Sequence, residues 1–119
     1  MDITDVQVAD LVERLSRDLR STGMASYLHL VQSEILHAQE LFDHPNFFLD
    51  KDDPSRPERF EEKVVEDVQQ DILDSMIVWP PCPRHPNHPL WYHDGNWVCE
   101  QEKASIATVG ALAGQRGRE

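Results

Sequence analysis

The sequence predicts a mainly α protein in which a three-helix antiparallel bundle precedes a small β-hairpin module. Two observations predict this fold. Apolar residues recur at helical spacing in three segments, and these segments are separated by glycine or proline. Beyond the last of these breaks, an Asp-Gly pair separates two short runs rich in aromatic residues, which is a hairpin signal.

The first helix is predicted to follow Thr4, because Thr4-x-x-Gln7 is a capping box. Gly23 is the residue type that ends helices, so it supplies the stop. The apolar stripe between these signals consists of Val8, Leu11, Val12, Leu15 and Leu19.

A second helix is predicted from about Met24 to Phe42, and His44-Pro45 ends it because a residue before proline avoids the α conformation. Its stripe is Leu28, Val31, Ile35, Ala38 and Phe42, widened by Tyr27 and Leu41. The apolar run Phe47-Phe48-Leu49 is expected to fold back onto the helices, since its exposure would favour association.

The third helix is predicted to begin at a second capping box, Ser55-x-x-Glu58, with Pro57 in its first turn. The motif Trp79-Pro80-Pro81 ends the helical part of the chain. The stripe of this helix is Phe60, Val64, Val65, Val68, Ile72 and Met76.

A two-residue loop at Asp94-Gly95 fixes the register of the predicted hairpin, because a type I′ turn needs positive φ at both central positions. The expected pairs are His93 with Asn96, Tyr92 with Trp97, Trp91 with Val98, and Leu90 with Cys99. A further short strand is expected near Ile106, Val109 and Leu112.

Four side chains of the types that zinc prefers lie within residues 82–99. They are Cys82, His85, His88 and Cys99. Paired strand residues share a face and faces alternate, so the hairpin directs Cys99 toward His88 and turns His93 away. The sequence therefore predicts a structural zinc ion bound by these four side chains. Glu100 or Glu102 could replace one histidine, and the alternative without metal is a pair of buried cysteines beside a proline-rich turn.

The stretch from residue 79 to 99, WPPCPRHPNHPLWYHDGNWVC, resembles zinc-knuckle or zinc-ribbon-like modules of small bacterial proteins. The resemblance rests on the CPxHxxHPL turn and the W-x-C hairpin, and it covers residues 79–112. It implies a structural zinc and no known activity. The second paired knuckle of an ordinary ribbon is missing here. Three units are thus predicted: an acidic helical bundle (1–78), the zinc hairpin module (79–112) and a flexible tail (113–119).

The acidic residues are concentrated in the helical part. Residues 1–80 hold 18 Asp and Glu against 7 Lys and Arg, which accounts for the formal net charge of −11. This charge disfavours direct nucleic-acid binding and favours a basic protein partner, with simple solubility as the plainer explanation. A homodimer is left open. No run of the sequence is apolar enough for a membrane segment or a signal peptide, and the expected location is the cytoplasm.

Known catalytic signatures such as H-E-x-x-H, G-x-S-x-G and the P-loop are missing from the sequence. We therefore expect a non-enzymatic interaction protein, an adaptor or regulator. One alternative is an acidic inhibitor, of the kind found in phage or mobile elements, that occupies the basic nucleic-acid site of an enzyme. The other is a zinc hydrolase, in which Cys82, His85 and Cys99 hold the ion and a water completes the shell.

Overall fold

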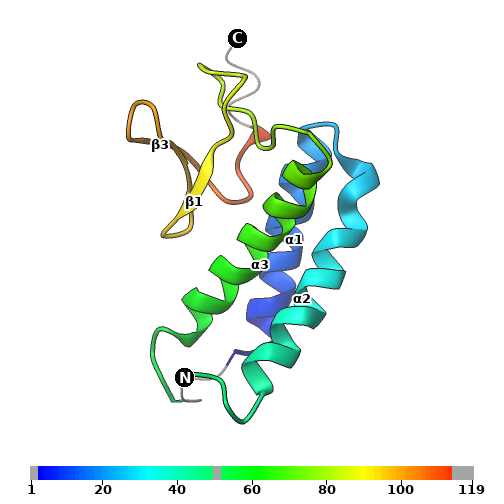
Figure 1. The fold of residues 1–119 in the computed structure, drawn as a ribbon, viewed down its shortest axis with the longest axis vertical. Coiled ribbons are helices and arrows are strands. Elements are labelled where there is room, and N and C mark those ends of the chain that lie inside the picture. The colour runs from blue at the N-terminus through cyan, green and yellow to red at the C-terminus, as the bar shows by residue number, and fades with distance from the viewer. Residues whose placement is uncertain (1–2, 50–51, 114–119) are drawn as a thin grey trace.

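The computed structural model (Figure 1) describes residues 3–49 and 52–113. Its helices contain about half of the chain, so the prediction of a mainly α protein is confirmed. The predicted flexible tail lies, apart from residue 113, outside the described residues. The elements are α1 (Asp5–Ser21), η1 (Ala25–Tyr27), α2 (Leu28–Asp43), α3 (Arg56–Asp74), β1 (Trp91–His93), β2 (Asn96–Cys99) and β3 (Ala104–Thr108).

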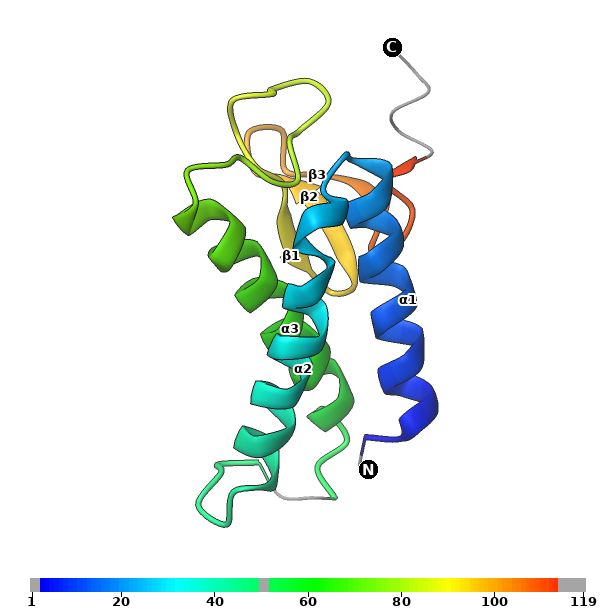
Figure 2. The ribbon, with the colours of Figure 1, turned by 90° about the vertical axis from the view of Figure 1, so that its right-hand side faces the viewer.

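The three helices run in alternating directions, with the small sheet beside them (Figure 1). Turned by 90°, the molecule shows the sheet next to the end of the helical layer where α1 and α3 finish (Figure 2). None of the helices in the described ranges has the length and apolar character needed to cross a membrane.

Helix α1 begins as predicted. The Thr4 side chain accepts a hydrogen bond from the Gln7 N–H, and the Gln7 side chain accepts one from the Thr4 N–H, at 3.1 and 2.8 Å. Gly23 follows the helix with a φ of +77°, a conformation that glycine adopts without strain. The capping box therefore sets the start of this helix and glycine its end.

Two predictions for α3 are wrong. Within the described residues, the Ser55 side chain makes no capping bond to the helix, and its hydroxyl donates instead to Asp53 Oδ1 at 2.6 Å. Met76 is 93% exposed because α3 ends at Asp74, so Met76 lies beyond the helix, with a φ of 66°. A proline in the first turn starts this helix without the predicted box.

The apolar run after α2 is only partly covered. The Phe47 ring packs on Phe42 with ring centroids 4.2 Å apart, as expected of a segment that folds back. Phe48 is 73% exposed, so the prediction is wrong for this residue. Its ring lies against Phe47 at the edge of the core, where one aromatic layer already covers Phe42.

The strands form one antiparallel sheet in the order β1-β2-β3. The predicted hairpin pairs within β1 and β2 are confirmed, and both Asp94 and Gly95 have positive φ, 49° and 81°. Strand β3 pairs with β2 through a register shift between Trp97 and Val98. The expected third strand is present as Ala104–Thr108, so it includes Ile106 and ends before Val109 and Leu112.

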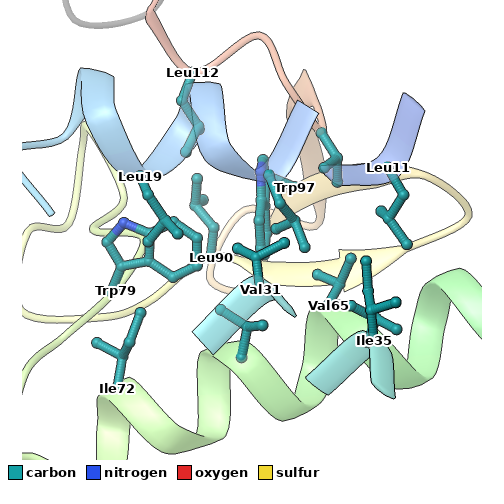
Figure 3. Close-up of a cluster of buried hydrophobic side chains, with 14 of the residues drawn as sticks. Leu11, Leu19, Val31, Ile35, Val65, Ile72, Trp79, Leu90, Trp97 and Leu112 are labelled. Carbon is teal, nitrogen blue, oxygen red and sulfur yellow. The ribbon is translucent and has the colours of Figure 1, made fainter. Parts of the chain in front are cut away.

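One continuous cluster of buried side chains joins the helices to the sheet (Figure 3). Figure 3 shows Trp79 between Leu19 of α1 and Ile72 of α3. The buried members that follow the helices in sequence are Trp79, Cys82, Leu90, Trp97, Cys99, Val109 and Leu112. The hairpin module and the helices thus share their core.

Two buried polar side chains fasten the module to the helices. Asp18 of α1 is fully buried and accepts hydrogen bonds from Trp97 Nε1 (2.8 Å) and from the N–H groups of Gly110 (2.6 Å) and Leu112 (3.0 Å). Burial raises the pKa of Asp18, and these three donors oppose the shift. Gln69 of α3 donates to the carbonyls of Trp79 (3.1 Å) and Leu90 (2.6 Å).

Candidate metal centre

The proline-rich turn that carries three of the predicted ligands is closed by backbone hydrogen bonds. The Cys82 N–H donates to the His88 carbonyl at 3.0 Å, and the Leu90 N–H donates to the Pro80 carbonyl at 2.7 Å. Inside this closed loop, the His85 N–H donates to the Cys82 carbonyl at 3.2 Å. The turn therefore holds Cys82 and His85 close together in spite of its prolines.

The two cysteines come from different segments and lie against one pocket. Cys82 and Cys99 are 1% and 2% exposed, and within the described part of the chain neither forms a disulfide. A small pocket of about 120 Å³ is lined by both cysteines and by His88. Cys99 reaches this place because it ends strand β2, whose residue Trp97 is fixed in the core.

Glu102, in the turn between β2 and β3, lies beside His85. Its Oε2 lies 3.0 Å from His85 Nε2, and its Oε1 accepts a hydrogen bond from Arg84. The hydrogen bond from Arg84, and next the one with His85, lowers the pKa of Glu102. This side chain is therefore an ionised carboxylate held at the Nε2 atom of His85.

His85, Cys99 and Glu102 form a compact group in which one potential ligand atom from each lies within 4.8 Å of the others. The structure thus brings together two of the four predicted ligands and adds a carboxylate that the sequence offered only as a replacement. Cys82 and His88 share the adjacent pocket with Cys99, but lie outside the compact group. His93 is exposed on the other face of the hairpin, and its Nε2 lies 3.4 Å from Asp94 Oδ2.

The donor types in this region match a zinc site. Thiolate, imidazole and carboxylate all bind zinc, at bond lengths near 2.0–2.3 Å. Ligand atoms around a tetrahedral zinc are therefore about 3–4 Å apart, whereas the potential ligand atoms of the compact group lie within 4.8 Å of one another. The arrangement can hold a metal with small side-chain movements.

A second feature, the acidic groove, lies between α3 and the β1–β2 turn. Its volume is about 620 Å³, and Tyr92 is among the residues that line it. The Tyr92 hydroxyl donates to Glu61 at 2.6 Å, and Arg14 donates to the other oxygen of the same carboxylate. Glu61 is therefore neutralised within the molecule. The remaining carboxylates of the groove are Glu58, Glu62 and Asp94, and Arg59 lies 3.6 Å from Glu62.

Like charges crowd the surface of α3 next to this groove. The pKa of Glu66 is raised by burial first, and then by the negative charges of Glu62 and Asp67. A carboxylate whose ionisation is opposed by its neighbours is stabilised when a cation approaches. Two cations of α3 already lie among these carboxylates, Lys63 at 2.9 Å from Asp67 and Arg59 at 3.6 Å from Glu62.

Comparisons with protein-family models, with curated proteins and with solved structures give no match. The resemblance of residues 79–112 to zinc-knuckle modules consequently stays a prediction.

Proposed function

We propose that this chain is a non-enzymatic, zinc-stabilised interaction protein of the cytoplasm. In this proposal residues 79–112 hold one structural zinc ion, and the acidic surface of the helices binds a basic protein partner. The observation that carries the proposal is the convergence of His85, Cys99 and Glu102, with buried Cys82 beside them. These donors come from three separate turns or strand ends, which a metal ion would tie together.

A structural role for the metal is supported by the burial of its proposed thiolates. Cys82 and Cys99 both belong to the core cluster, which also contains Trp79 and Trp97. Ionised thiolates are costly to bury unless a cation neutralises them, and zinc does so by direct bonding. Zinc would therefore stabilise the part of the core that the module contributes.

The acidic groove supports the choice of a basic partner. It is large enough for a long side chain, and it is lined by Tyr92 and by the carboxylates of Glu58, Glu62 and Asp94, of which Glu62 is paired with Arg59. An arginine side chain matches both features, since its guanidinium stacks on aromatic rings and pairs with carboxylates. The acidic inhibitor is one form of the same proposal, in which the basic partner surface is a nucleic-acid site.

The metal is tested by its stoichiometry. We expect the native protein, purified with zinc supplied, to carry about one zinc per chain by native mass spectrometry. The double variant Cys82→Ser, Cys99→Ser should lose the metal because hydroxyl groups are poor zinc ligands. The control is His93→Ala, which should retain it because His93 lies on the other face of the hairpin. A wild-type protein that folds cooperatively without metal under these conditions would refute the zinc proposal.

The partner surface is tested with a short oligo-arginine peptide as the probe. We expect binding that weakens steeply with salt, because exposed charges are screened beyond about 8–10 Å at physiological ionic strength. The triple variant Glu58→Gln, Glu62→Gln, Asp94→Asn should bind the peptide more weakly and with a smaller salt dependence. Titration calorimetry at several salt concentrations measures both.

The control for the peptide experiment is a second triple variant that removes the same charge elsewhere. Glu13→Gln, Glu40→Gln, Asp43→Asn changes exposed carboxylates of α1 and α2 away from the groove. Equal losses in both triple variants would show that the peptide responds only to net charge, and the groove would then have no specific role.

A further inference from the structure

Two side chains compete for the last position around the proposed zinc, His88 and Glu102. His88 is exposed and its ring lies outside the compact group. Glu102 lies inside it, 3.0 Å from the His85 ring and close to the Cys99 sulfur. The proximity of donor atoms therefore favours the carboxylate.

A carboxylate ligand changes the net charge of the zinc site. Two thiolates already neutralise a zinc dication, so a third anion gives the shell a net charge of −1. Arg84 compensates this negative charge, because its guanidinium is hydrogen-bonded to Glu102 Oε1. The second oxygen of the same carboxylate is hydrogen-bonded to His85 Nε2 at 3.0 Å, a spacing close to that of two ligand atoms on one zinc ion. Ligand, metal and counter-ion together are then neutral.

We propose that Glu102, in place of the predicted His88, is the fourth zinc ligand, beside Cys82, His85 and Cys99, and that Arg84 positions its carboxylate. This inference rests on the proposed zinc site. It assigns the shell two sulfur donors, one nitrogen donor and one oxygen donor. Cys82 and His88 both line the pocket beside Cys99, and Cys82 is preferred as the remaining ligand because it is buried whereas His88 is exposed.

The proposed shell is unequal in its exposure. The two sulfurs belong to the core, whereas the side chain of Glu102 is 34% exposed. Glu102 and His85, whose side chain is 35% exposed, are thus the ligands that solvent or a competing anion reaches first. An oxygen donor also makes the site more accepting of harder divalent metals than a shell of two thiolates and two imidazoles.

The direct test is X-ray absorption at the zinc edge on the full-length, zinc-loaded protein. We expect two sulfurs and a single imidazole, with an oxygen in the remaining position. Two imidazoles would overturn the inference and leave the zinc proposal intact. A protein that binds no zinc at all would instead overturn the zinc proposal itself, so the two failures are distinguishable.

The zinc affinities of single variants provide a second test of whether Glu102 or His88 is the ligand. Glu102→Gln keeps the size and hydrogen-bonding capacity of the side chain but removes the anionic ligand, so zinc affinity should fall by about tenfold or more. His88→Ala should leave the affinity unchanged. Glu100→Gln is the matched control, because Glu100 lines the neighbouring pocket but lies outside the compact group.

Competition with a chromophoric chelator measures the zinc affinity of each variant. A large loss in His88→Ala, with Glu102→Gln unaffected, would overturn the inference and restore the predicted shell. An equal loss in Glu100→Gln and Glu102→Gln would overturn it as well, since it would show a general effect of charge. Arg84→Gln should weaken binding less than Glu102→Gln does, because it removes the counter-ion and leaves the ligand.

Discussion

Replacing Asp18 by alanine is expected to lower the free energy of unfolding by about 3–5 kcal/mol, because three buried donors would lose their acceptor together. These donors are the Trp97 indole N–H and the N–H groups of Gly110 and Leu112. A loss of this size is a large share of the stability of a typical domain. Urea unfolding followed by far-UV circular dichroism and by tryptophan fluorescence measures it.

Two further variants make the Asp18 experiment decisive. Asp18→Asn should have a smaller but clear effect, because the amide oxygen still accepts while the NH₂ group faces an N–H donor. Asp10 lies on the same helix in an exposed ion pair with Arg14. The variant Asp10→Asn should therefore change the free energy of unfolding by less than about 1 kcal/mol. If Asp18→Ala were as mild as Asp10→Asn, the carboxylate would have no role in joining the module to α1.

Removing zinc from the loaded protein is expected to lower the thermal midpoint by about 10 °C or more. The reason is that Cys82 and Cys99 belong to the same buried cluster as Trp79 and Trp97. The tryptophan emission should shift to longer wavelength as these rings gain solvent. Most of the helical far-UV signal should remain at low temperature, since the helices supply most of the core side chains.

The control for zinc removal is the Cys82→Ser, Cys99→Ser variant. Without chelator, this variant should have the thermal midpoint and tryptophan emission of the chelated wild-type protein. Adding chelator to the variant should change neither property. If the zinc-loaded wild-type protein kept its midpoint and its emission after chelation, the metal would not be structural. A complete loss of helix would mean that the helices depend on the metal, against the predicted division at residue 78.

The elements that follow from local chemistry could be predicted from the sequence. The capping box at Thr4 and the positive φ at Asp94 and Gly95 depend on residues within one turn, and both are confirmed. Ser55 shows the limit of such signals, because the nearby Asp53 competes for its hydroxyl. Met76 fits the stripe of α3 in spacing but lies beyond the end of the helix.

The polar contacts over long sequence separations could not be predicted in the same way. In the sequence, Asp18 is one of several acidic residues of a charged helix. Its position does indicate burial, because Asp18 lies at helical spacing on the same face as Leu11 and Leu15. Its three hydrogen-bond donors, however, are supplied only by the tertiary structure. Glu102 was recognised only as a substitute ligand, and its place beside His85 depends on how the β2–β3 turn folds back.

The acceptor role of Asp18 has a consequence for the order in which a nascent chain can complete its fold. The helices leave the ribosome first, yet the donors for Asp18 are contributed by residues 97, 110 and 112. Until residue 112 has emerged, α1 carries an ionisable group on the face that must become dry. Water at that carboxylate would keep the interface between α1 and the later segments open during synthesis, and the core would close only when the last donors arrive.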